Sequence, residues 1–288
     1  MTPKYVIITP VRDEEQYIES TIACILKQAV LPTEWVLVDD GSADGTGAII
    51  DKYARQYLWI HAIHRDNRGY RLSGSGVMQA FYDGYKNMTC RDWEYLVKLD
   101  GDLSFSPDYF QKCFEKFQAE LRLGIGGGAL YHRINGQLEL EENPQFHVRG
   151  ATKIYRRACW KDIEGLQTTP GWDTVDEVKA NMMGWRTQTF PEIHLLHHRF
   201  TGTADTTWRE SVKNGRGSYA SGYHPIYFGV RCLYRLVRRL EVVGSIGMIW
   251  GFVSGYLQKY PRVNDEKLVG YIRHQQMARL LGRETIWR

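Results

Sequence analysis

Apolar runs and amphipathic stretches take turns along the first third of the chain, a pattern that predicts alternating strands and helices. Residues 4–9 and 35–38 are predicted strands, and apolar residues recur between them at helical spacing from Ile18 to Leu26. Residues 13–15 supply an acidic first turn for this helix. A strand, a helix and a strand in this order form a βαβ unit with parallel strands. The chain therefore begins like an α/β protein.

The same alternation continues toward the middle of the chain. Strands are predicted at 58–63 and 95–99, each followed by an amphipathic helix. Glycines and Asn-Gly pairs then divide shorter alternating runs, which favours antiparallel strands or a hairpin. A helix that begins at Asp173 and ends at Gly184, and a last strand at 187–196, complete the predicted sheet region.

The last part of the chain is predicted to be mainly helical. Residues 230–240 form a basic amphipathic stretch, and residues 242–257 form an uncharged one that contains four glycines. The second stretch is shorter than the ~20 residues that a spanning helix needs. We interpret the pair as a helix on a membrane surface followed by a buried or shallowly inserted helix. Two ordinary helices packed on the rest of the protein remain an open alternative. The predicted domains are 1–204 and 205–288.

The net charge of +4 is distributed unevenly. Residues 1–204 carry 23 Lys and Arg against 27 Asp and Glu, whereas residues 205–288 carry 14 against 6. A basic segment predicts an anionic partner such as a membrane surface or nucleic acid, although a solvated helical face is the simpler explanation. We expect peripheral membrane contact through 230–257 and no nucleic-acid partner.

The cysteines and the first residues point to the cytoplasm. Five scattered cysteines form no Cys-x-x-Cys pair, which is typical of reduced thiols. Residues 1–5 lead straight into a predicted strand, so we expect no secretory signal. The expected location is the cytoplasm, at the inner face of the cell membrane.

Carboxylates close two of the predicted strands. Asp100 and Asp102, separated by one glycine, follow the strand at 95–99, and Asp39 and Asp40 end an earlier one. Parallel strands place these ends on one edge of a sheet, where ligands bind. An Asp-Gly pair alone is most often a turn. Several carboxylates at one edge are nevertheless costly unless they bind a cation or share a proton. Mg²⁺ and Mn²⁺ prefer such oxygen ligands.

Three stretches, at 5–15, 38–46 and 99–102, follow one another in an order and spacing that resemble family 2 glycosyltransferases of the GT-A fold. The resemblance covers roughly residues 4–200. It implies an α/β fold with a Rossmann-like, mainly parallel sheet flanked by helices, followed here by a C-terminal helical extension. It also implies transfer of a sugar from a nucleoside diphosphate sugar, with UDP as the favoured nucleotide, inversion at the anomeric carbon, and Mg²⁺ or Mn²⁺.

The resemblance assigns roles to the matching residues. The loop after the first strand would border the nucleoside, and Asp39 would accept a hydrogen bond from the base. Asp100 and Asp102, the Asp-x-Asp (DXD) pair, would face the ribose, the metal and the diphosphate. A late histidine would complete the metal shell, which makes His197 and His198 candidates. The implied nucleotide-sugar residues are Thr9, Pro10, Arg12, Glu14, Asp39, Arg71, Asp100, Gly101 and Asp102.

The family's catalytic base is an aspartate that opens a helix ending in glycine and an aromatic residue. Counting back from Gly184-Trp185 places this base on Asp173, although Trp172 stands where the family has Glu. Asp176, about one helical turn further on, is the competing candidate, and both can face one direction. The acceptor hydroxyl is weakly nucleophilic, so a carboxylate should take its proton.

We therefore expect an inverting, metal-dependent glycosyltransferase of the hexosyltransferase type, active in polysaccharide biosynthesis. Its acceptor would be a hydroxyl of a glycan or a lipid-linked molecule. The alternatives are a nucleotidyltransferase, which would incorporate nucleotide into its product, and a non-catalytic nucleotide-sugar-binding protein, which would bind UDP with Mn²⁺ without transfer.

Overall fold

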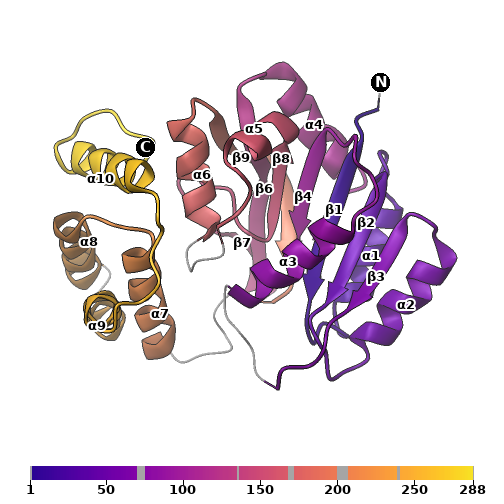
Figure 1. Ribbon diagram of the computed structural model, residues 1–288, viewed down its shortest axis with the longest axis horizontal. Coiled ribbons are helices and arrows are strands. Elements are labelled where there is room, and N and C mark those ends of the chain that lie inside the picture. Colours follow the sequence, from indigo (N-terminus) through magenta and orange to yellow (C-terminus); the bar gives the residue numbers. More distant parts are fainter. Residues whose placement is uncertain are drawn as a thin grey trace.

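The computed structural model describes residues 2–69, 75–134, 136–167, 172–199, 207–238 and 241–287. Strands and helices alternate from β1 to α3, as Figure 1 shows. The strands of the described chain are β1 (Tyr5–Val11), β2 (Glu34–Asp39), β3 (Ile60–His64), β4 (Tyr95–Leu99), β5 (Leu103–Phe105), β6 (Leu123–Ile134), β7 (Gln137–Leu140), β8 (Thr152–Arg156) and β9 (Arg186–His197). The helices are α1 (Ile18–Leu26), α2 (Thr46–Gln56), α3 (Ser75–Asn87), α4 (Tyr109–Ala119), α5 (Arg157–Asp162), α6 (Trp172–Met182), α7 (Thr207–Ala220), α8 (Pro225–Arg238), α9 (Val242–Leu257) and α10 (Glu266–Leu280).

These strands form one mixed sheet in the order β3-β2-β1-β4-β8-β6-β9-β5, with β7 paired to β6. β1 is parallel to β2 and β4, and β2 is parallel to β3. β8 runs antiparallel to both of its neighbours, β4 and β6, whereas β6 and β9 are parallel. The predicted α/β class with a mainly parallel sheet is therefore confirmed. The antiparallel β6–β7 hairpin agrees with the change of pattern in the middle of the chain.

Helices cover both faces of the sheet, because side chains alternate along each strand. Tyr5 and Ile7 of β1 join a core cluster with residues of α1, α2 and α4. Val6 and Ile8 point the other way and pack with residues of α3, α5 and α6. The strands near β1 are therefore buried on both sides, which leaves their ends as the places where polar groups can gather.

The C-terminal helices α7–α10 lie at one end of the long axis, and α2 and β3 lie at the other (Figure 1). α10 packs on α6, where Leu268 and Ile272 meet Val175 and Val178. A separate cluster joins α7, α8 and α9. No helix within the described chain is both long and apolar enough to cross a membrane. The division into 1–204 and 205–288 stays a prediction.

The structure corrects two local expectations. α1 begins at Ile18, and no side chain caps it, so the predicted acidic first turn at 13–15 is wrong. Asp13 instead has a φ of 53°, and its carboxylate accepts a hydrogen bond from the main-chain amide of Ala43 at 2.8 Å. The second difference is that α5 was not predicted, and that β8 lies in the region of predicted antiparallel strands without having been given bounds.

Candidate active site

The pairing of β5 with β9 brings predicted metal ligands together. β5 starts directly after Asp102, and its first residue, Leu103, pairs with His197 at the end of β9. The main-chain amide of His198 also donates to the carbonyl of Asp102 at 2.9 Å. One ligand atom from each of Asp100, Asp102 and His197 then lies within 4.8 Å of the other two. These three residues are the Asp–Asp–His group.

The Asp–Asp–His group has the donor chemistry of a divalent-cation site. Two carboxylates and an imidazole suit Mn²⁺, and carboxylates with substrate phosphates suit Mg²⁺. His197 Nε2 lies 3.2 Å from a carboxylate oxygen of Asp102. His197 Nδ1 is buried and has no hydrogen-bond partner among the described residues. Because two carboxylates and one imidazole converge within 4.8 Å, the residues present fit a divalent cation.

The charges in this group shift its own pKa values. Burial would raise the pKa of Asp102, but the hydrogen bond from His197 and the positive charges of His197 and Arg199 outweigh burial and lower it. Burial would lower the pKa of His197, and the contact with Asp102 more than reverses that effect. Asp102 is therefore ionised at neutral pH and can serve as an anionic ligand.

The acidic turn is anchored on both sides. Asp100 is partly exposed and forms an ion pair with Lys98, which is buried. The main-chain amide of Asp100 donates to the carbonyl of Ala151 at 2.8 Å, which ties the turn to β8. A Cβ at Gly101 would lie 2.8 Å from Val11 Cγ1. The turn therefore needs glycine, because the end of β1 packs directly on it.

Val11 also connects this turn to Asp39, which was predicted to contact the base of the nucleotide. It pairs with Asp39 across β1 and β2, and its carbonyl accepts from the amide of Asp40 at 2.8 Å. Since Val11 contacts the Gly101 position as well, the two acidic stretches lie on the same edge of the sheet, on either side of the end of β1.

Thr9 and Asp39 already have partners inside the chain. Thr9 is fully buried, and its hydroxyl accepts from Trp35 Nε1 at 2.9 Å. The Asp39 carboxylate accepts from the main-chain amide of Ser42 at 2.8 Å and lies 3.2 Å from His64 Nδ1. In this structure Thr9 supports the core, and Asp39 fixes the turn between β2 and α2.

The loop after β1 holds further predicted residues. Pro10 lies in β1 and is partly exposed. Arg12 donates to the carbonyl of Asp40 at 2.9 Å and to Asn67 Oδ1 at 3.0 Å, so it joins the loops that follow β1, β2 and β3. Arg71, the remaining predicted contact to the nucleotide, lies outside the described residues.

Arg199 connects the Asp–Asp–His group to the loop after β1. Its guanidinium pairs with Glu14, and its Nε lies 3.9 Å from a carboxylate oxygen of Asp102. It also donates to the carbonyl of Asp13 at 3.1 Å and lies 5.6 Å from the centre of the Tyr17 ring. The sequence predicted no role for Arg199. The only signal is its position directly after the two candidate histidines.

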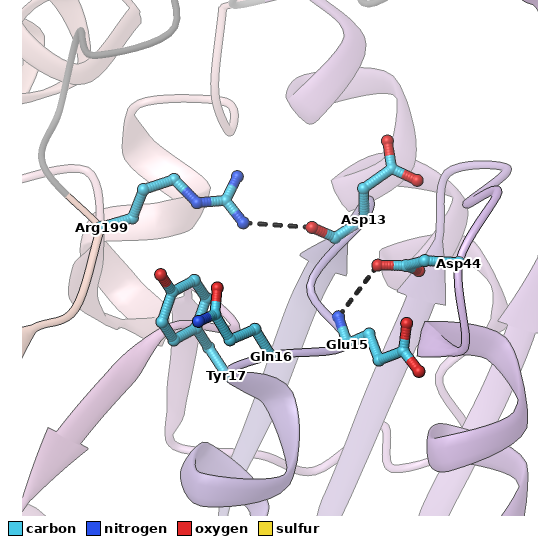
Figure 2. A pocket seen from close by; sticks show the side chains of 6 residues that line it. All are labelled: Asp13, Glu15, Gln16, Tyr17, Asp44 and Arg199. Carbon is cyan, nitrogen blue, oxygen red and sulfur yellow. Dashed lines mark hydrogen bonds between the residues drawn. The ribbon is translucent and has the colours of Figure 1, made fainter.

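A cavity of about 440 Å³ opens beside Arg199, as Figure 2 shows. It lies where the loop after β1, the loop after β2 and the end of β9 meet. The main-chain amide of Glu15 donates to Asp44 at 3.1 Å, which fixes one wall. Among the lining side chains Arg199 is cationic, whereas Asp13, Glu15 and Asp44 are acidic. The lining residues are Asp13, Glu15, Gln16, Tyr17, Asp44 and Arg199.

His198 lies outside the Asp–Asp–His group. Its Nε2 is 2.6 Å from Ser104 Oγ, and its ring stacks on Tyr17 with the ring centres 5.8 Å apart. Burial lowers the pKa of His198, so this ring is neutral at pH 7. Its side-chain contacts therefore lie with Ser104 and Tyr17.

Asp173, the favoured candidate base, lies in the first turn of α6. Lys153 of β8 donates to its main-chain carbonyl, and Lys153 is paired with Lys98 of β4 in the sheet. The side chain of Asp173 is partly exposed. Burial would raise its pKa, but the charges of Lys153, His147 and Arg149 outweigh burial and lower it. Asp173 is thus ionised, as a general base must be, and it is less deeply buried than Asp176.

Asp176, the competing candidate, is part of a buried network. It is 1% exposed and accepts from Tyr155 Oη at 2.6 Å and from Lys153 Nζ at 2.9 Å. Glu177, also buried, lies 2.8 Å from the same Lys153 Nζ and 2.8 Å from His147 Nδ1. Burial, opposed by Lys153 and reinforced by Glu177, raises the pKa of Asp176 to about 6. Two carboxylates therefore share one ammonium group.

Comparison with known proteins supports the family that the sequence resembles. The family model described as Glycosyl transferase family 2 matches residues 6–157. The uncharacterized glycosyltransferase EpsJ of Bacillus subtilis is 31% identical over 134 residues, which are 46% of this chain and 35% of that protein. The chain spans less than half of the length of the curated relatives it matches.

Two solved structures have a similar fold. The mannosyltransferase PcManGT from Pyrobaculum calidifontis, in complex with GDP-Man and Mn²⁺, has a TM-score of 0.58 and 14% identity, with 98% of this chain and 81% of that chain covered. TarS from S. aureus, in complex with UDP-GlcNAc, has a TM-score of 0.55 and 17% identity, with 91% of this chain and 74% of that chain covered. At these identities the likeness concerns the fold.

Proposed function

The chain belongs to glycosyltransferase family 2 and has the GT-A fold, and from this premise we propose that it transfers a hexosyl residue from a nucleoside diphosphate sugar to an acceptor hydroxyl. The observation that carries the proposal is the meeting of Asp100, Asp102 and His197 at the sheet edge, next to the cationic Arg199. Such a group can stabilise the negative charge that grows on a diphosphate as it leaves.

We propose that Asp100, Asp102 and His197 hold Mn²⁺ or Mg²⁺. When bound, the ion would act as a Lewis acid toward the diphosphate. Arg199, whose side chain is partly exposed, adds positive charge next to this group, where it would attract the phosphates. Thr9, Pro10, Arg12, Glu14, Asp39, Arg71 and Gly101 remain the proposed surroundings of the nucleotide.

We propose Asp173 as the base that takes the proton of the acceptor hydroxyl. One base and one displacement invert the configuration of the sugar carbon, whereas retention would need a second carboxylate close enough to act as nucleophile. The ionised state of Asp173 and its partial exposure support this role. Asp176 is the weaker candidate, because its carboxylate is buried and held by Lys153 and Tyr155.

The donor is best identified by product analysis. One similar structure holds GDP-Man and the other UDP-GlcNAc, so the screen includes sugars of both nucleotides; our proposal is a UDP-sugar. Purified protein is incubated with each donor, Mn²⁺ and glycan or polyprenyl phosphate acceptors, and released nucleoside diphosphate is measured. We expect release with one donor and its loss when EDTA is added. Nucleotide found in the product, or binding without release, would contradict transfer.

The choice of base is tested in the same assay. Asp173→Asn should lower kcat by about 10²- to 10⁴-fold while donor binding persists. Asp176→Asn should retain most of the activity, because its carboxylate is already engaged. The reverse result would exchange the two roles.

We further propose that the acceptor is a glycan or a lipid-linked molecule at the inner face of the cell membrane. The basic composition of 205–288 supports this location. Residues 230–257 would provide the contact with the membrane.

A further inference from the structure

α9 packs with its small residues inward and its large apolar residues outward. Glycine and serine fill most of its buried face, together with Met248 and Phe252. Its outward side chains are 43–72% exposed, and all of them are large and apolar. A surface helix in water normally shows the opposite arrangement, with a polar outer face. The exposed residues are Val242, Val243, Ile246, Ile249, Trp250, Val253, Tyr256 and Leu257.

The inward glycines allow α9 to lie directly against α7. A Cβ at Gly251 would be 2.0 Å from the carbonyl oxygen of Val212, and a Cβ at Gly215 would be 2.0 Å from that of Met248. Small residues that let two backbones approach this closely are typical of helix pairs in lipid, where large apolar side chains gain nothing by turning inward. The α7–α9 pair therefore has the packing of a helix pair with apolar surroundings.

α8 packs beside α9 and carries an outward apolar stripe of its own. It joins α9 through the stacked rings of Phe228 and Phe252, whose centres are 4.2 Å apart. Figure 1 shows α8 and α9 together at one end of the long axis. The exposed side chains of α9 and the outward apolar side chains of α8 form what we call the α8–α9 apolar face. The α8 members are Ile226, Val230, Leu233, Tyr234 and Val237.

Charges border this face but do not interrupt α9. Arg231 and Arg235 lie on α8, where Arg235 is paired with Glu241 at the start of α9. Lys259 and Arg262 follow α9, and α9 itself carries no charged residue. Aromatic side chains such as Trp250 sit among the aliphatic ones, the composition of helices that lie in a membrane interface. With 16 residues, α9 is about 24 Å long, and a bilayer core is about 30 Å thick. Its dimensions suit an in-plane helix.

We propose that the α8–α9 apolar face lies in the surface of an anionic bilayer, with the outer side chains of α9 among the lipid chains. This proposal deepens the proposed function by naming the helix faces that meet the membrane. It depends on the proposed function only where it assumes an acceptor at the membrane. A second copy of the chain is the weaker occupant, because an isologous contact would bring the arginines of two α8 helices together. Anionic lipid headgroups instead complement these arginines.

The experiment uses the full chain, without donor, in flotation with vesicles of phosphatidylcholine alone or mixed with phosphatidylglycerol. Wild type should float with the mixed vesicles, and brominated lipids should quench its fluorescence by an amount that Trp250→Phe reduces. Ile246→Glu with Val253→Glu should weaken partitioning by at least about tenfold, since it places charges in the lipid-facing surface. The matched control is Leu58→Glu, whose side chain is 96% exposed between α2 and β3.

The outcomes separate the occupants. Wild type that stays in solution as a dimer, dissociated by the double substitution, would assign the face to a second copy. Vesicle binding that the double variant retains, without quenching, would reduce the contact to surface charge and overturn the proposal. Because donor turnover is measured separately, a failure of membrane binding leaves the proposed transfer reaction untouched, and the converse also holds.

Discussion

Charged side chains are buried at the sheet edge, whereas large apolar side chains are exposed on the α8–α9 apolar face. Asp102 is 4% exposed and His197 is 8% exposed, while Leu257 is 72% exposed. Both arrangements reverse the common distribution of polar and apolar residues. They differ in whether the chain itself provides partners that offset the unfavourable burial or exposure. Asp102 has His197 and Arg199 within the chain, but the described residues leave the outer side of α9 uncovered.

This difference teaches how each region depends on its surroundings. A buried charge with internal partners is stable before any ligand arrives, so the sheet edge can be preorganised for a cation and a diphosphate. An exposed apolar face has no such partners within the chain, and only contact with another surface removes it from water. Changes at the sheet edge should therefore alter chemistry or folding within the protein, and changes on the outer side of α9 should alter location.

The largest effect is expected from Asp102→Asn. The substitution removes a charged ligand from the Asp–Asp–His group, and losing several kcal/mol of charge stabilisation corresponds to a loss of about 10³-fold in kcat/KM. Transfer rates at saturating Mn²⁺ measure it. His198→Gln is the control, since that ring contacts Ser104 and Tyr17 outside the group. Equal losses in the two variants would mean that the group has no special role.

Lys153→Met tests whether buried charges here rely on partners within the chain. It leaves the carboxylates of Asp176 and Glu177 without their shared ammonium group. Removing one member of a buried ion pair costs about 3–5 kcal/mol of unfolding free energy. Lys52→Met is the control, because its pair with Glu19 is about half exposed and such pairs contribute about 0–1 kcal/mol. Urea denaturation of the two variants gives both values, and similar values would disprove the shared-ammonium interpretation.

Asp176→Asn should change how stability depends on pH. The pKa of Asp176 is about 6 in the folded protein, and that of an unfolded aspartate is about 4. Between these two pH values the folded state binds a proton that the unfolded state has lost. The contribution of Asp176 to the free energy of unfolding therefore falls by up to about 3 kcal/mol as the pH rises from about 4 to about 6. Asparagine does not titrate. The stability of the variant relative to wild type should therefore be greater at pH 7 than at pH 4, and an unchanged difference would exclude the raised pKa.

The bounds of some apolar stretches were predicted accurately from the sequence, but α8 begins at Pro225, five residues before the predicted basic stretch. Elements that depend on distant partners were predicted least well. The uncharged run at 242–257 matches α9, because hydrophobicity and the absence of breakers are local properties. The bounds of β8 were not predicted, because its pattern contains Lys153, a residue type that argues against a buried strand. The carboxylates of Asp176 and Glu177 make this lysine acceptable, and they are more than twenty residues away along the chain.

The candidate site shows the same limit. The Asp100–Asp102 pair could be found from its position after a strand, but Arg199 gains its place only through the pairing of β5 with β9. The acidic stretch at 13–15 was misassigned to a helix start for a related reason. Its carboxylates serve partners such as Ala43 and Arg199, which the local rules for helix capping do not consider.

The smallest expected effect compares two glycines of α7. A Cβ at Gly215 would lie 2.0 Å from the Met248 carbonyl, whereas a Cβ at Gly217 meets nothing within 4 Å. Gly215→Ala must push α9 away and should cost about 1–3 kcal/mol of unfolding free energy. Gly217→Ala should instead raise it by about 0.4–1 kcal/mol, because alanine restricts the unfolded chain.

Denaturation and vesicle flotation of the two variants sharpen the contrast between the regions. Gly215→Ala leaves the outer side chains of α9 unchanged, so it should lower stability while vesicle binding persists. A Gly215→Ala variant that is no less stable than wild type would show that α7 and α9 do not approach closely. The inward glycines would then no longer explain why the large side chains of α9 point outward, and the lipid-like packing of this end of the molecule would lose its structural basis.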